Sequence, residues 1–195
     1  MLLFGLQTIS LFLLDFRGNP SNHGHRKEQA GPMTDTTHST ASSVREKLIE
    51  HLFMGELLKQ LWIAGHRDVE VLRAEVDARG YDVVIEAGGT LRHIQLKASA
   101  IGAKTSTVTV NLDLAKKPSG CIVWIWFDPE TLDLGPLLWF GGAPGEQLPD
   151  PGDRVARHTK ANSRGEKAER SNHRVVNKGR FEVTDSGELA ERLFG

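Results

Sequence analysis

The sequence is short of the features that mark several common classes of protein. It has one cysteine in 195 residues, which excludes an intramolecular disulfide and fits a reducing compartment, so we expect a cytoplasmic protein. Its net charge is −1, so the chain as a whole has no bulk electrostatic signature. The apolar run Met1–Leu14 stops at Asp15 and is too short for a transmembrane helix. We therefore expect no stable membrane association.

Several sequence motifs of known chemistry are also missing. We find no internal repeat, no heptad array, no glycine-rich phosphate loop, no Cys/His zinc spacing and no Ser-His-Asp pattern with local context. The single thiol, Cys121, lies in the apolar segment 121–127. This setting predicts a packed core residue rather than a nucleophile.

The N-terminal segment differs in composition from the rest. Met1–Leu14 lacks the basic start and the small-residue cleavage site of a signal peptide. The following residues to Thr40 are rich in Gly, Pro, Ser and His, which predicts disorder. Met33 offers an alternative start. We interpret residues 1–32 as an over-extended start or a dispensable leader within a leader region 1–42; a true export or anchoring segment is the alternative.

The most informative segment is 80–97. Gly88-Gly89 separates two β-rich runs, which predicts a hairpin with a two-residue turn. In that register Ala87 faces Thr90, and Asp82 faces Gln95. Strand alternation places Gln95 and Lys97 on one side. A carboxylate, an amide oxygen and an ammonium would then meet on one patch, the outline of a metal and phosphate site.

A plain solvated face is the competing interpretation of the same polar residues. Two observations weigh against it. Val84 and Leu91 lie on the same predicted face, which is therefore not uniformly polar. The strand carrying Lys97 also continues into the small residues 98–100 rather than into a charged loop.

These residues resemble the PD-(D/E)XK nuclease superfamily, above all its restriction-endonuclease-like and Holliday-junction-resolvase-like branches. The matching positions are Gly80-Tyr81-Asp82 and Gln95-Leu96-Lys97, and the resemblance covers roughly Ser43 to Phe140. It departs from the family at Gln95, where Glu or Asp is commoner and is the stronger ligand for a hard divalent ion. Glu56 best matches the acid on the family's first helix, with Glu46 and Glu50 as weaker candidates.

The resemblance implies a chemistry and a set of roles. Asp82, Gln95 and the Leu96 backbone carbonyl would hold Mg²⁺ or Mn²⁺ beside the scissile phosphate, where the ion acidifies water. Glu56 would reach the metal through water. Lys97 would position or deprotonate the water, and a lysine can act as a base only if its pKa is lowered. Glu75, Asp77 and Glu86 are further acids near the hairpin, and surface positions are the simpler interpretation for them.

The resemblance and the residue patterns together predict an α/β fold with a restriction-endonuclease-like core, in which a mixed β-sheet is flanked by helices. A first helix should start at a Ser42 or Ser43 cap and run to Ala64, with apolar residues recurring at helical spacing. Segment 121–127 is almost wholly apolar, which predicts a central strand buried on both faces. The expected strands are 69–76, 82–87, 91–98, 105–112, 121–127 and 136–140, and the core domain is 43–145.

The remaining region, 146–195, combines a basic segment with a C-terminal helix. Asp185 or Ser186 should cap the helix Gly187–Phe194. A locally basic segment on a near-neutral protein is a candidate phosphate-binding footprint, and a solvated linker is the alternative. The candidate nucleic-acid-binding residues are Arg154, Arg157, Lys160, Arg164, Lys167, Arg170 and Arg174.

The sequence therefore predicts a metal-dependent nuclease that hydrolyses phosphodiester bonds of DNA. Two other classes stay open: a catalytically silent nucleic-acid-binding or interaction module on the same fold, and an exported or anchored protein with no nucleic-acid role. The sequence fixes neither the DNA form nor the oligomeric state, and a homodimer is compatible with it.

Overall fold

The computed structural model describes residues 35–74, 79–158, 160, 165 and 167–195. Residues 35–195 form one compact unit. The leader of the sequence prediction, up to residue 34, lies outside the described residues, as do Glu75 and Asp77. No helix within the described part of the chain is long and apolar enough to cross a membrane.

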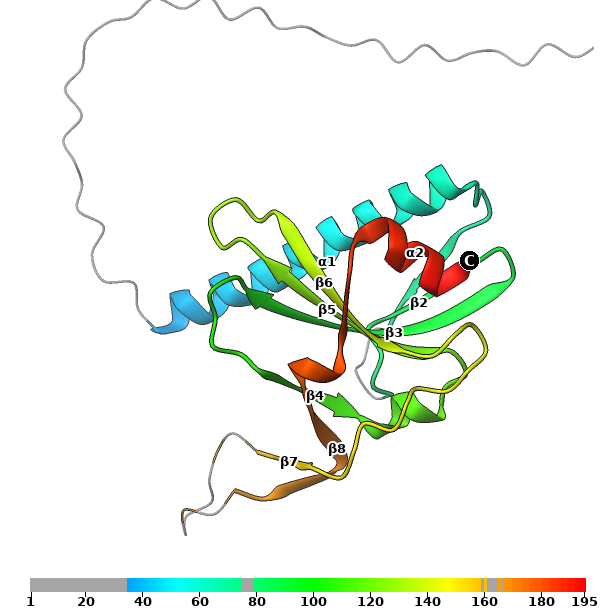
Figure 1. Ribbon diagram of the computed structural model, residues 1–195. Coiled ribbons are helices and arrows are strands. Elements are labelled where there is room, and N and C mark those ends of the chain that lie inside the picture. The colour runs from blue at the N-terminus through cyan, green and yellow to red at the C-terminus, as the bar shows by residue number, and fades with distance from the viewer. Residues whose placement is uncertain (1–34, 75–78, 159, 161–164, 166) are drawn as a thin grey trace, which may run out of the picture. The chain divides into compact units, whose positions relative to one another are not determined.

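The described chain forms two α-helices, two short 3₁₀ helices and nine strands (Figure 1). The helices are α1 (Asp35–Ala64), η1 (Leu112–Lys116), η2 (Lys178–Arg180) and α2 (Ser186–Phe194). The strands are β1 (Glu70–Arg73), β2 (Val83–Ala87), β3 (Thr90–Ala100), β4 (Thr107–Asn111), β5 (Gly120–Phe127), β6 (Leu134–Gly141), β7 (Val155–Arg157), β8 (Glu169–Asn177) and β9 (Glu182–Thr184). The helix α1 starts at Asp35 rather than at the predicted cap, and Ser43 lies inside it.

The main sheet is mixed and has the strand order β1-β2-β3-β5-β6-β9. Among the described strands of this sheet, β3 and β5 pair in parallel, and all other neighbouring strands pair antiparallel. The predicted hairpin register is confirmed, since Ala87 pairs with Thr90 and Val84 with His93. Gly88 and Gly89 both have positive φ, at 57° and 77°, as a two-residue turn of this kind requires.

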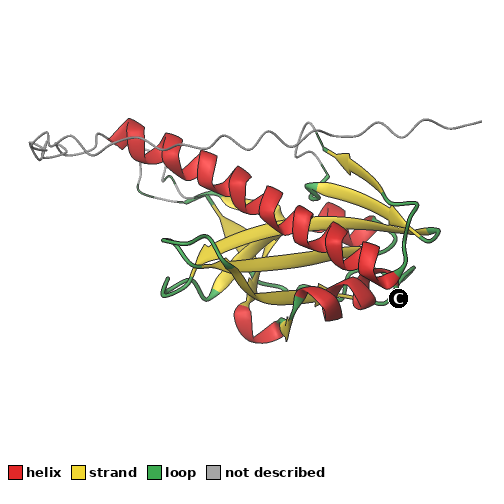
Figure 2. Ribbon diagram, turned by 90° about the horizontal axis from the view of Figure 1, so that it is seen from above, coloured by secondary structure: helices red, strands yellow, loops and turns green. Residues whose placement is uncertain are grey.

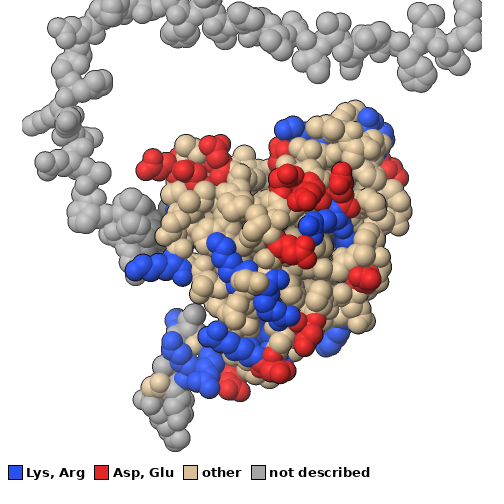
Figure 3. Space-filling view, in the orientation of Figure 1, with Lys and Arg blue, Asp and Glu red and all other residues tan. Residues whose placement is uncertain are grey.

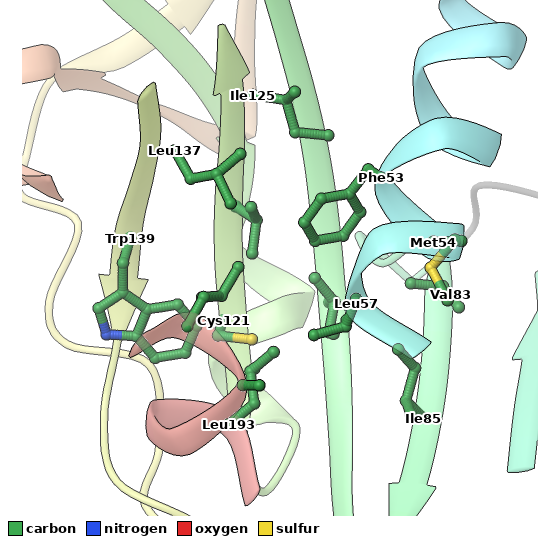
Figure 4. Packing of buried hydrophobic residues seen from close by; sticks show 14 of the residues in the cluster. Phe53, Met54, Leu57, Val83, Ile85, Cys121, Ile125, Leu137, Trp139 and Leu193 are labelled. Carbon is green, nitrogen blue, oxygen red and sulfur yellow. The ribbon is translucent and has the colours of Figure 1, made fainter. Parts of the chain in front are cut away.

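Both α-helices pack on one face of this sheet (Figure 2). The face of α1 that is buried carries Ile49, Phe53, Leu57 and Leu61, and Figure 4 shows Phe53 and Leu57 against the sheet. Four other apolar residues of the predicted helical pattern are exposed: Leu48, Leu52, Leu58 and Trp62. Apolar residues occur on both sides of this helix, so periodicity alone does not select the side that packs.

The opposite face of the main sheet is covered by a second sheet, of order β4-β8-β7. Between the two sheets lies a second apolar core that includes Trp124, Leu138 and Val176. The strand β5 is buried along its whole length, as predicted, because it contributes to both cores. Much of the basic segment, for which a solvated linker was the alternative, forms the strands β7 and β8. These strands pair with each other, and β8 also pairs with β4.

The C-terminal helix α2 begins as predicted. Asp185 is its N-cap, and the side chain accepts a hydrogen bond from Glu188 N. At the other end of α2, the fully buried Arg92 donates to the backbone oxygens of Leu193 (2.7 Å) and Arg192 (2.5 Å). A buried cation at a helix C-terminus satisfies carbonyls that have no partner within the helix.

Candidate functional site

The centre of the candidate site is Asp82, one residue before β2 begins. Its backbone N–H donates to Ile94 O at 2.9 Å, so Asp82 is held at the end of the hairpin, where Ile94 is also the register partner of Val83. Its carboxylate oxygen Oδ2 accepts a hydrogen bond from Leu96 N at 2.6 Å. The carboxylate is thus fixed beside the Leu96 peptide, as a site that uses both Asp82 and the Leu96 carbonyl would need.

A hollow of about 290 Å³ opens next to this carboxylate. Asp82, Leu96 and Lys97 line it from the hairpin. Its other lining residues are Glu46, Ile49, Glu50, Ala98 and Ile125. Segments around positions 46, 82 and 97 therefore meet at one place, and two of the predicted catalytic residues, Asp82 and Lys97, share one hollow.

Gln95 lies on the same side of β3 as Lys97, as its strand position requires. In the parallel register with β5, Gln95 is paired with Ile122 and Lys97 with Trp124. Both of these partners belong to the second apolar core. Gln95 is 4% exposed, and its Oε1 has no hydrogen-bond partner among the described residues. Most buried side-chain acceptors in folded proteins have a hydrogen-bond partner, so this oxygen is an exception.

Two acids of α1 reach this site, and both are among the weaker candidates of the sequence prediction. Glu46 and Glu50 flank the buried Ile49 on the helix, so the packing of Ile49 brings them to the hollow. Glu50 forms ion pairs with Lys47 (2.8 Å) and Arg73 (3.5 Å). With Asp82, it also lines a smaller adjoining hollow of about 70 Å³.

Glu56, the preferred acid of the sequence prediction, is not brought to Asp82. It lines a separate hollow of about 420 Å³ between α1, the start of β6 and the start of α2. Its carboxylate accepts hydrogen bonds from Gln60 (2.8 Å) and Ser186 (3.1 Å). The pKa of Glu56 is lowered, first by the Gln60 hydrogen bond and then by Lys59. Glu56 lies on nearly the same side of α1 as the buried Ile49, but seven residues, or about 10 Å, further along the helix, so its position along the axis keeps it from the hairpin.

The oxygen donors at the hollow suit a hard divalent cation. No group of three or more His, Cys, Asp or Glu side chains is gathered for a metal anywhere in the described residues. Mg²⁺ is commonly held by one or two carboxylates and several waters, together with substrate phosphate, so it does not need such a group. Asp82, Glu50 and the Leu96 carbonyl supply ligands of that kind. Gln95 does not line the hollow, because its strand position turns its side chain to the second apolar core, on the face of the sheet opposite α1.

The candidate nucleic-acid-binding residues lie mainly on β7 and β8. Arg157 is on β7 and forms an ion pair with Glu169 (3.4 Å), while Arg170 and Arg174 are on β8. Arg154 precedes β7, Lys160 and Lys167 belong to the connection between the strands, and Arg164 lies outside the described residues. Lysine and arginine side chains gather on the lower part of the face in Figure 3, where Figure 1 places these strands.

Comparisons with known proteins return little. No protein-family model matches the chain, and a search of curated proteins finds no match. Among solved structures the chain is similar to a Holliday junction resolvase of the archaeon Archaeoglobus fulgidus, with 16% identity and a TM-score of 0.35. That likeness covers 74% of this chain and 98% of the resolvase.

Proposed function

We propose that this protein is a metal-dependent nuclease that hydrolyses phosphodiester bonds of DNA. The observation that carries the proposal is the 290 Å³ hollow, where the fixed Asp82 carboxylate meets Lys97 and the acids of α1. Carboxylates and a lysine around one open hollow are the groups that phosphodiester hydrolysis uses: oxygen ligands for a cation and a positive charge for the phosphate.

Each side chain has a role in this proposal. Asp82, Glu50 and the Leu96 carbonyl would hold Mg²⁺ or Mn²⁺. The ion supplies Lewis-acid chemistry, which is the acidification of water and the neutralisation of phosphate charge. Lys97 positions the attacking water and balances charge on a phosphate oxygen. The hydrogen bond from Leu96 N keeps the Asp82 carboxylate oriented before substrate arrives.

The basic side chains of β7 and β8 supply the second part of the proposal. Contacts from arginine and lysine to phosphate position a duplex without reading its sequence. Arg157, Arg170 and Arg174 are exposed or half-buried and lie on paired strands, so their spacing is fixed by the sheet. We infer that they hold the DNA backbone.

A cleavage assay tests the proposal. The protein is incubated with linear, supercoiled, single-stranded and branched DNA in Mg²⁺, Mn²⁺ or EDTA. We expect cleavage that EDTA stops, and a loss of at least about 100-fold in Lys97→Ala and in Asp82→Asn, with folding unchanged. Lys59→Ala removes an exposed lysine of α1 outside the hollow, and this matched control should cleave as the wild type does. Cleavage that persists equally in Lys97→Ala would show that this hollow is not the active site.

One observation favours the silent binding module as the second candidate. Gln95, where the family more often has an acid, is almost fully buried, and a neutral amide is a weak ligand. If the wild type binds DNA without cleaving it in any metal, and Gln95→Glu cleaves, the silent module is the correct function.

A further inference from the structure

A further hollow, of about 260 Å³, is lined by three cations and one carboxylate: Arg79, Lys116, Lys117 and Asp113. Lys116 forms an ion pair with Asp113 (Nζ to Oδ1, 2.6 Å). Lys116 and Arg79 both lower the pKa of Asp113, so this carboxylate is ionised and offsets one of the three cations. The hollow therefore keeps a net positive charge.

The wall of this hollow is held by a hydrogen-bonded scaffold. The Asn111 side chain caps η1 by accepting from Asp113 N at 3.0 Å. Asn172 of β8 donates to Asn111 Oδ1 and to Asp113 Oδ2, each at 2.9 Å. Gly80, the residue after Arg79, packs closely against the same scaffold, since a Cβ on Gly80 would lie 2.7 Å from Asn111 Cβ. The three basic residues therefore lie next to backbone that these hydrogen bonds and contacts hold in place, rather than on a free loop.

This basic hollow adjoins the candidate catalytic site. Lys117 Nζ lies 5.5 Å from the centre of the Tyr81 ring, and Tyr81 immediately precedes Asp82. Tyr81 and Asp82 together line the 70 Å³ hollow that Glu50 shares. Arg79 is three residues from Asp82, which limits their Cα separation to about 11 Å. On its other side the scaffold includes Asn172 of β8. This strand also carries Arg170 and Arg174.

We propose that Arg79, Lys116 and Lys117 form a phosphate subsite. It binds a backbone phosphate of the polynucleotide a few nucleotides from the scissile bond, and so links the catalytic hollow to the basic strands β7 and β8. The subsite rests on the proposed nuclease function for its ligand. Its chemistry is that of ammonium and guanidinium groups around an anion, which favours phosphate without discrimination between bases.

The test compares salt dependence of binding in two charge-matched triple variants. One variant is Arg79→Gln/Lys116→Gln/Lys117→Gln. The control, Lys59→Gln/Arg67→Gln/Arg192→Gln, removes the same charge from two exposed positions, on α1 and in the segment that follows it, and from a half-buried position on α2. The affinity for a labelled DNA duplex is measured in EDTA across a salt series. We expect the slope of log affinity against log salt to flatten by about 0.9 for each lost phosphate contact in the first variant, with little change in the control.

A single substitution guards against a folding artefact. Lys117→Gln leaves the Lys116–Asp113 ion pair and the Asn172 hydrogen bonds in place. We expect it to flatten the slope without lowering the melting temperature. In Mg²⁺ it should raise KM for DNA and leave kcat unchanged, because the subsite binds a part of the substrate that does not react.

The outcomes separate this subsite from the proposed function. The subsite is refuted if its variants keep the wild-type slope of log affinity against log salt, or if that slope flattens equally in both triple variants. Either result leaves the nuclease proposal standing. A flattened slope in a protein that never cleaves supports the subsite and refutes the nuclease function. A wild type that binds no DNA refutes both.

Discussion

At the scale of single residues, the candidate site depends on where a few polar groups are held. The Asp82 carboxylate is fixed by the Leu96 N–H, and Gln95 places an acceptor without a partner in the interior. Glu50 is half-buried between Lys47 and Arg73. Each of these positions gives a prediction that can be measured.

Gln95→Glu should lower the free energy of unfolding in EDTA, because it places a carboxyl group at a site that is 4% exposed. If Gln95 is a ligand position, added Mg²⁺ should stabilise the variant more than the wild type. The gain should approach about 2.7 kcal/mol at a metal concentration of 100 times Kd. Thermal melts with and without Mg²⁺ measure this directly. Equal shifts in the two proteins would place the metal ligands elsewhere.

Glu50→Gln should reduce cleavage more strongly than Glu56→Gln, because only Glu50 lines the hollow with Asp82. We expect a loss of at least about 10-fold in kcat/KM for Glu50→Gln, corresponding to about 1.4 kcal/mol of transition-state stabilisation. Steady-state kinetics on one DNA substrate are sufficient. The reverse order would restore Glu56 as the acid of the first helix.

At the scale of elements, the turn Gly88-Gly89 sets the register in which Val83 pairs with Ile94, directly after Asp82. A one-residue slip would turn every side chain of β2 to the other face of the sheet. On the other strand of the hairpin, the buried Arg92 ties β3 to the end of α2. The site is therefore positioned by a tight turn and by the packing of α1, and both depend on backbone geometry more than on the polar residues themselves.

Gly89→Ala should lower the free energy of unfolding by about 1–2 kcal/mol, the cost of a side chain in left-handed backbone. Gly89 has a φ of 77° and open space around it, so conformational strain is the only penalty. Gly179→Ala is the matched control, with no positive φ and nothing within 4 Å of its added Cβ. Urea denaturation of both variants measures the difference. Equal stabilities would mean that the turn tolerates alanine.

At the scale of the whole molecule, β5 joins two apolar cores, with helices over one and a second sheet over the other. Cys121 lies on this strand and is fully buried. Burial raises the pKa of its thiol to about 12. The thiol therefore stays neutral and shielded for as long as both layers remain packed on β5.

Cys121 should react with a thiol reagent at pH 8 only at the rate of global unfolding. Between pH 9 and 12 the unfolded chain ionises its thiol while the folded chain does not, so this group should lower stability as the pH rises through that window. Labelling kinetics across a urea series test the first statement. Rapid labelling in the absence of urea would show that the core around β5 opens locally.

The local sequence was sufficient to predict the hairpin register, the central strand β5 and the cap of α2. Each of these depends on neighbouring residues: two glycines at a turn, an unbroken apolar run, and an aspartate three positions before a free N–H. The roles of Asp82 and Lys97 rest on the family resemblance, which short motifs of neighbouring residues carry. Both residues line one hollow, whereas Gln95, which strand alternation groups with Lys97, does not line it.

The buried side of α1, the pairing of the basic segment with β4 and the basic hollow beside Tyr81 were decided by the tertiary structure alone. Apolar residues on both sides of α1 leave the choice of its buried side to packing, and the place where Ile49 packs along the sheet brings Glu50, nearly two turns before Glu56, to the hollow. Arg79 and Lys117 are 38 positions apart in sequence and share a hollow only because η1 packs against the chain leading into β2. Strand and turn signals extend over a few residues, whereas contacts between distant segments follow from how whole faces bury their apolar area.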